Sequence, residues 1–152
     1  MIDDNVKKYI DKSVLCWLAT CDSELFPNVS PKEMFTYSVN STFLIANLAS
    51  PNSVNNIVKN PNVCVSFIDI FVQKGYKLQG TATVIDKEDV EFNSKVKPLT
   101  DLFSDKFPIK SVIEITVTKV DTIKAPSYFL YSDTTEENQI KNAMITYNVK
   151  PN

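Results

Sequence analysis

Apolar and polar residues alternate along much of this chain with a period of two, the spacing that predicts β-strands with one face buried. Two stretches show the alternation most clearly, residues 76–85 and 111–123. The positions expected to face a core are Tyr76, Leu78, Ala82 and Val84 in the first stretch and Ile113, Ile115 and Val117 in the second. Each stretch therefore predicts one strand that lies half-buried in a sheet.

Four more segments are predicted as strands: 14–20, 28–39, 42–47 and 62–71. Segment 14–20 is almost wholly apolar, so we expect it to be buried on both faces, with Trp17 as a core aromatic residue. Asn40-Ser41 predicts a tight turn. Six successive strands with short helices between some of them, and only two Gly in the chain, favour a closed antiparallel barrel over a parallel βαβ sheet.

Short helices interrupt the strands. Residues 5–12 have apolar positions three and four apart, which predicts an amphipathic helix. Ser50-Pro51 is typical of a helix start, because Ser caps free N–H groups and Pro is favoured at the first helical position. The expected buried stripe of that helix is Val54, Ile57 and Val58.

The region 86–107 predicts a polar helical connection that Pro98 breaks or kinks. Thr134 and Glu137 have the spacing of a capping box, and Ile140, Ala143, Met144 and Tyr147 follow at one-face helical spacing. The sequence therefore predicts a C-terminal helix over about 134–148, at the end of a single domain that spans residues 1–152.

The composition of the chain limits the kinds of binding partner and the compartment that we expect for this protein. The formal net charge is -2, so no strong basic field predicts nucleic-acid binding. The chain shows neither a signal peptide nor an apolar run long enough to span a bilayer, so we expect a cytoplasmic protein without membrane association. Cys16, Cys21 and Cys64 are an odd set, which suits a reducing compartment better than a disulfide scaffold. Structural core thiols are the favoured interpretation of these residues.

The chain contains no His, and all 16 basic residues are Lys. A Ser-His or Cys-His hydrolase, a His-rich zinc site and a His-ligated haem all require an imidazole, so these are excluded, and we predict no metal site. Any bound anion must be held by Lys, hydroxyls, amides or backbone N–H groups, without the bidentate guanidinium of Arg.

Three motifs occur together in order. They are Pro27-Asn-Val-Ser-Pro-Lys32, the strand 43–47 running into Ser50-Pro-Asn-Ser-Val-Asn-Asn-Ile-Val-Lys-Asn-Pro61, and Gly75-Tyr-Lys-Leu-Gln-Gly-Thr-Ala82. Their order and spacing resemble the pyridoxamine 5'-phosphate oxidase-like split-barrel family, which binds flavin mononucleotide (FMN). The resemblance implies a mainly β fold, a six-stranded antiparallel split barrel with flanking helices. It also implies a homodimer with two FMN sites at the interface.

Carried over by position, the resemblance implies that ten residues surround the flavin and its phosphate: Ser30, Pro31, Lys32, Ala46, Asn47, Leu48, Ser50, Asn52, Ser53 and Lys77. The helix start supports this placement physically, because its free N–H groups and partial positive charge attract a phosphate. Similar proteins carry Lys or Arg where this chain has Asn52 and Val54. Lys32 and Lys77 are the candidates to supply the missing positive charge.

The resemblance implies an FMN-dependent oxidoreductase that acts on a small-molecule substrate or electron donor, with the cofactor performing the chemistry. Pyridoxamine phosphate oxidase itself is excluded, because its pattern has Arg and His near the C-terminus and both are absent here. The sequence identifies no catalytic residue. The alternative is a non-catalytic binding module of the same fold with weakened or lost flavin affinity, which Asn52 and Val54 favour.

Overall fold

The computed structural model describes residues 1–39 and 41–151, so the predicted turn at Asn40-Ser41 lies partly outside the described residues. The elements are α1 (Asp4–Lys12), β1 (Cys16–Cys21), β2 (Pro27–Lys32), β3 (Phe35–Ser38), β4 (Thr42–Asn47), α2 (Pro51–Lys59), β5 (Asn62–Asp69), β6 (Lys74–Asp86), α3 (Phe92–Leu102), β7 (Ser111–Lys124), α4 (Ser127–Leu130) and α5 (Glu136–Tyr147). The fold is mainly β, as predicted.

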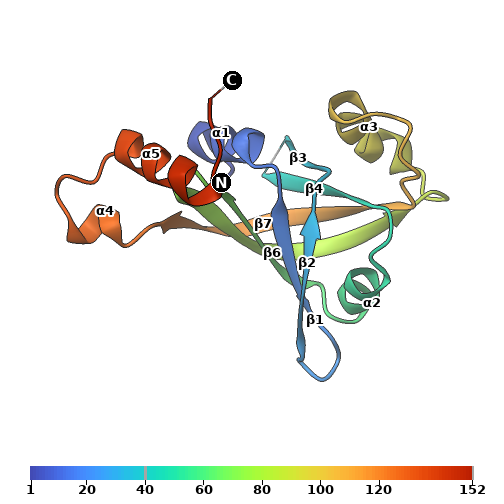
Figure 1. The fold of residues 1–152 in the computed structure, drawn as a ribbon. Helices are drawn as coiled ribbons and strands as arrows, with labels where there is room; N and C mark the ends of the chain where they lie inside the picture. The colour runs from blue at the N-terminus through green and yellow to red at the C-terminus, as the bar shows by residue number, and fades with distance from the viewer. Residues whose placement is uncertain (40, 152) are drawn as a thin grey trace.

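The strands form one curled antiparallel sheet in the order β2-β1-β5-β6-β7-β4-β3 (Figure 1). It has seven strands among the described residues instead of the predicted six. The predicted strand 28–39 is split at Glu33–Met34, because β2 and β3 belong to opposite ends of the strand order and one straight strand cannot serve both. The split-barrel prediction is confirmed, with this correction to the count.

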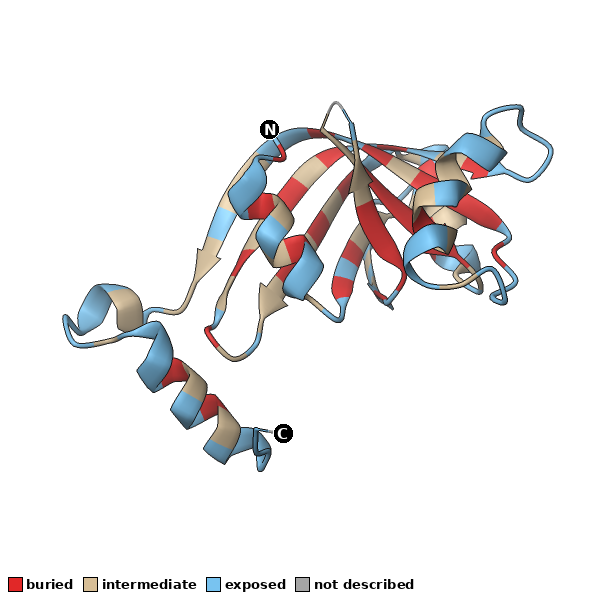
Figure 2. Cartoon of the chain, turned by 90° about the horizontal axis from the view of Figure 1, so that it is seen from above, coloured by how far each residue is buried: buried red, intermediate tan, exposed pale blue. Residues whose placement is uncertain are grey.

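The main core fills the concave side of the sheet. Alternate positions of the strands are buried there, which Figure 2 shows as red bands along each strand. Leu78, Ala82, Ile113, Ile115 and Val117 are all buried, so the predicted alternation of β6 and β7 is confirmed. A smaller cluster, centred on Leu44, Leu99 and Val112, lies beneath α3. β4 is therefore buried on both faces.

The convex face of β1 is uncovered, and here the prediction for 14–20 is wrong. Cys16, Leu18 and Thr20 are buried, but Trp17 is 46% exposed and Val14 is 81% exposed. Both faces of this strand are apolar, yet none of the described helices covers the outer one, so the core role predicted for Trp17 is corrected to an exposed one.

The helix α2 begins as predicted, but the composition of its buried face differs. Ser53 and Ile57 are its buried residues, while Val58 is 75% exposed and the predicted stripe is wrong at that position. Helix α1 agrees with its prediction and buries Val6 and Ile10.

Helices α4 and α5 lie beyond the ends of β6 and β7, away from the barrel core (Figures 1 and 2). The N-cap of α5 is Thr135, whose side chain accepts from the N–H of Asn138, one residue later than the predicted capping box. Among the described residues, no helix is long and apolar enough to cross a bilayer.

Candidate functional site

Two adjoining hollows lie where β2 meets the start of α2. One, of about 200 Å³, is lined by residues 28–31 and 49–53; the other, of about 230 Å³, contains Lys32, Ala46, Leu48 and Phe107. Pro31, Ala49 and Ser50 line both. Small-molecule pockets are usually about 300–1,000 Å³, so the two hollows reach that size only together. We call this region the β2–α2 corner. Its polar residues are Asn28, Ser30, Lys32, Glu33, Ser50, Asn52 and Ser53.

Lys32 is the central charge of the corner. Only 5% of the residue is exposed, and its Nζ donates to Ser30 Oγ at 3.0 Å and to Ser50 Oγ. None of the described carboxylates lies within ion-pair distance of it. Burial lowers the pKa of Lys32, an effect that the nearby Cys16 thiol partly opposes. A buried ammonium without a counter-ion is costly, and an anion delivered to this corner would offset that cost.

The sequence places Lys32 here through the register of β2. Its partner on β1 is Cys16, and Ser30 is opposite Leu18, so Ser30 and Lys32 share the inner face of this edge strand. The inner face leads directly to α2, which packs against β1 and β2.

The start of α2 supplies further unpaired groups. Ser50 is the N-cap residue, but its side chain makes no capping bond and instead accepts from Lys32. The N–H groups of the first turn therefore lack the usual side-chain acceptor. Ser53 is only 1% exposed, and its hydroxyl has no hydrogen-bond partner among the described residues. Buried hydroxyls are normally paired, so Ser53 is a polar group that a bound ligand could satisfy.

The structure brings together eight of the ten predicted site residues, all of which line one of the two hollows: Ser30, Pro31, Lys32, Ala46, Leu48, Ser50, Asn52 and Ser53. Asn47 lines neither. Its amide Nδ2 donates to Ser111 Oγ at 2.9 Å and its Oδ1 accepts from the Ser50 N–H at 3.1 Å. Asn47 thus holds the loop that presents Ser50, instead of facing the hollow.

Lys77 also lies apart from the corner. It belongs to a cross-strand row on the convex face. In this row Lys77 is opposite Ser66, Ser66 is opposite Trp17, and Trp17 is opposite Pro31. Its Nζ is 3.6 Å from Asp121 Oδ2, and its side chain is 44% exposed. Within one chain, Lys77 and Lys32 are on opposite faces of the sheet and do not form one charged site.

Sequence reasoning missed several lining residues, including Asn28, Ala49 and Phe107. The period-two pattern could have identified Asn28, because this residue alternates with Ser30 and Lys32 on β2. No sequence pattern could have identified Phe107, because it comes from the connection between α3 and β7 and only the fold brings it beside Leu48.

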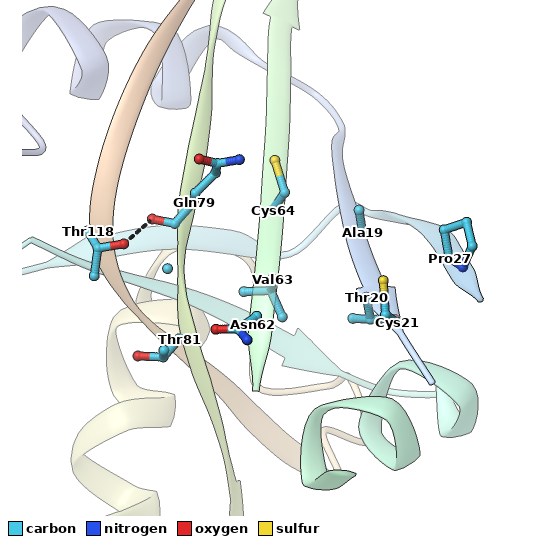
Figure 3. Close-up of a pocket in the computed structure, with 11 residues that line it drawn as sticks. Ala19, Thr20, Cys21, Pro27, Asn62, Val63, Cys64, Gln79, Thr81 and Thr118 are labelled. Atoms are coloured by element: carbon cyan, nitrogen blue, oxygen red, sulfur yellow. Dashed lines mark hydrogen bonds between the residues drawn. The ribbon is translucent and has the colours of Figure 1, made fainter. Parts of the chain in front are cut away.

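A third hollow, of about 390 Å³, lies elsewhere, on the convex face of β1, β5 and β6 (Figure 3). Its lining includes Ala19, Cys21, Cys64 and Gln79 but no charged side chain. Burial raises the pKa of the Cys64 thiol, so it is not primed as a nucleophile. This surface, which we call the outer-face hollow, offers no cationic side chain to a phosphate.

The fold is thus a split barrel with a buried cation behind a helix start. A family model described as pyridoxamine 5'-phosphate oxidase matches residues 2–124. The chain belongs to this family, and the predicted resemblance is confirmed. No curated protein sequence matches the chain.

Solved structures share the fold. HupZ of Group A Streptococcus is 23% identical with a TM-score of 0.70, covering 82% of this chain and 96% of its own. An FMN-binding protein from Syntrophomonas wolfei is 14% identical with a TM-score of 0.66, covering 79% and 84%. HutZ, the haem storage protein of Vibrio cholerae, is 15% identical with a TM-score of 0.62, covering 81% and 94%. At these identities the similarity concerns the fold alone.

Proposed function

We propose that this protein binds FMN with its phosphate in the β2–α2 corner, and that the bound flavin serves a small-molecule oxidoreductase reaction. The observation that carries the proposal is Lys32, which is only 5% exposed, donates to two serine hydroxyls and forms no ion pair with a carboxylate of the described residues, although Glu33 lines the same hollow. A phosphate would supply the counter-charge, and a charge-assisted hydrogen bond contributes about 1.5–3 kcal/mol.

The other polar groups of the corner suit the same ligand. The first turn of α2 offers unpaired N–H groups and the positive end of the helix dipole, and the orphaned Ser53 hydroxyl is available as a donor. Ala46, Leu48 and Phe107 in the adjoining hollow are apolar, as a ring system requires. When bound, the flavin would supply the hydride or electron transfer, and the chain's residues would bind and orient it.

The absence of His favours flavin over haem here. One relative of this fold is described as an FMN-binding protein and another as a haem storage protein. This chain has no His to serve as an axial ligand for haem iron. Its polar corner instead matches a phosphate ester.

A second candidate is a non-catalytic module that has lost tight flavin binding. It is favoured by the first turn of α2, where this chain has Asn52 and Val54. Among the described residues that line the two hollows, Lys32 is the only cation. Under this candidate the two hollows would take a different anion.

Titration of FMN with the purified protein, followed by quenching of flavin fluorescence, tests the proposal. Riboflavin is the matched control ligand, because it has the same ring system without the phosphate. We expect FMN to bind at least tenfold more tightly than riboflavin, equivalent to about 1.4 kcal/mol. Absence of quenching by either ligand would refute the flavoprotein proposal, and equal affinities would refute the placement of the phosphate.

We also propose a homodimer, in which a second copy completes the shallow hollows of the corner. Neither hollow encloses a molecule of the size of FMN alone, and the convex face leaves Trp17 and Val29 exposed. Light scattering at micromolar concentration should give twice the mass of the chain, 17.2 kDa. A monomer mass would contradict the dimer.

A further inference from the structure

The family match ends at Lys124, where β7 ends, and residues 125–151 form a separate arm that contains α4 and α5. None of its side chains belongs to either core cluster. The arm is attached to the β5–β6 turn by polar contacts, by the buried Ala143, and by Tyr147, which lies edge-on to Phe71. Lys74 Nζ is 2.7 Å from Glu136 Oε1, Tyr128 donates its hydroxyl to the Val72 carbonyl at 2.8 Å, and the N–H of Ala125 donates to the Gln73 carbonyl.

The arm leaves an apolar tip exposed. Phe129, Leu130 and Tyr131 are 73%, 70% and 62% exposed, in three consecutive positions at α4. By contrast, α1 buries Val6 and Ile10 and α3 buries Leu99, whereas α4 has no buried residue. Large apolar side chains exposed side by side mark a contact surface more often than a chance arrangement. We call these three residues the α4 tip.

The outer-face hollow has the complementary character. It is open and uncharged, and small apolar residues such as Ala19, Pro27 and Val63 alternate in its lining with hydroxyl and amide side chains (Figure 3). Its volume of about 390 Å³ would accommodate a large apolar side chain or two. An anchor side chain in a pocket surrounded by polar residues is the usual arrangement of an interface hot spot.

The α4 tip cannot reach the hollow of its own chain. Phe129 lies beside Lys124, whose Nζ is 5.0 Å from the ring centroid, and Lys124 is opposite Lys74 in the sheet. Gly80 lies six residues further along β6, which is roughly 20 Å at about 3.3 Å per residue. Because the arm is fastened at Lys74, only another molecule can bring a tip to the hollow.

We propose that the α4 tip of each protomer docks into the outer-face hollow of a second copy of this chain. Two such contacts related by a two-fold axis use the same surfaces on both copies, which closes the assembly as a dimer. Three side chains of about 150–250 Å² each, mostly exposed, bury on the order of 300–400 Å² per tip. With a tip and a hollow on each protomer, the contact approaches the roughly 800 Å² per partner of a stable interface.

Charges of both signs lie beside the tip. Lys77 and Lys119 share the single carboxylate of Asp121 near the hollow, which leaves one positive charge in excess. Asp133 follows the tip and takes part in no ion pair with the described residues, but Lys124 lies over the Phe129 ring and has the same sign as that excess. The pairing therefore rests on shape and buried area. The inference rests on the proposed homodimer and is independent of the flavin.

Native thiols provide a direct test, because Cys21 and Cys64 line the hollow. The variant Phe129→Cys is prepared as equal parts of ordinary and ¹⁵N-labelled protein, so that links between two molecules can be recognised by mass, and is then mildly oxidised. We expect an intermolecular disulfide from position 129 to Cys21 or Cys64. Mass spectrometry of the linked peptides identifies the pair. The control is Val90→Cys, at a fully exposed position of the loop before α3, which should form no such link. In Phe129→Cys combined with Cys21→Ser and Cys64→Ser, the link should disappear.

The unlinked protein gives a second measurement. Phe129→Ser with Leu130→Ser should weaken the dimer at least tenfold in sedimentation experiments, while Val90→Ser should not. A monomer, a dimer unaffected by the double substitution, or links that join position 129 only to itself would overturn the inference. If the link forms but FMN does not bind, the proposed flavin function fails and this interface stands.

Discussion

Two lysines that the sequence assigned to one cofactor site occupy opposite environments. Lys32 is buried behind Ser30 and Ser50 without a carboxylate, whereas Lys77 is on the convex face and lies near Asp121. An exposed, shared charge contributes little to binding, because water and its partner already screen it. A buried charge without a partner has more to gain from an anion. The difference shows that solvent access and existing partners decide which cation can hold a phosphate.

The largest expected effect separates these two lysines directly. Lys32→Met should weaken FMN binding by about 10–100-fold, since a charge-assisted hydrogen bond contributes about 1.5–3 kcal/mol. Lys77→Met, the matched control, should change the affinity less than about threefold. Fluorescence titration measures both, with circular dichroism to verify folding. A greater loss for Lys77→Met would mean that the phosphate is held at the convex face.

Adding a second lysine to the β2–α2 corner tests the same difference through a gain of FMN affinity. Asn52→Lys adds a cation to the first turn of α2, and we expect FMN affinity to rise by about tenfold. Asn55→Lys is the control, because it adds the same charge one turn further along the same exposed helix surface. If both variants bind FMN no better than the parent, the phosphate lies outside the β2–α2 corner.

The orphaned hydroxyl should produce a smaller effect. Ser53→Ala should weaken FMN binding by about fivefold, the value of one neutral hydrogen bond of about 1 kcal/mol. The same change should raise or preserve the free energy of unfolding of the ligand-free protein, because an unsatisfied buried hydroxyl is removed. Urea denaturation and titration together give both quantities. Ser66→Ala, at a half-buried position on β5, should leave FMN affinity unchanged.

The smallest effect concerns pH. Burial lowers the pKa of Lys32 from 10.5 in the folded protein, so the unfolded chain binds more protons between the lowered pKa and 10.5. The free energy of unfolding of the ligand-free protein should therefore rise with pH through that window, and the penalty is fully present below it. FMN affinity should fall over the same window as the ammonium loses its charge. The difference in urea stability between the parent and Lys32→Met isolates this contribution from other titrating groups; a pH-independent difference would contradict it.

The alternating strands were predictable because each depends on its own residues. Ile113, Ile115 and Val117 are buried as the period of two requires, and so is Leu78 on the neighbouring strand. The start of α2 was predictable for a similar reason, since Ser50 and Pro51 determine the local geometry of a helix start.

Burial of an apolar segment was less predictable where it depended on a neighbour. Trp17 and Val58 are as apolar as core residues, yet both are exposed because no described element of this chain covers them. The split between β2 and β3 has the same origin, since it is imposed by the places of the two strands at opposite ends of the sheet.

By itself, the sequence determined the mainly β fold, the family and the absence of imidazole and guanidinium chemistry, because these follow from composition, local periodicity and motif spacing. Only the tertiary structure decided which polar groups meet. It turned Asn47 inward to Ser111, separated Lys77 from Lys32, and placed Phe107 beside the corner. The physical reason is that the environment of a side chain, its burial and its partners, is created by residues distant in sequence.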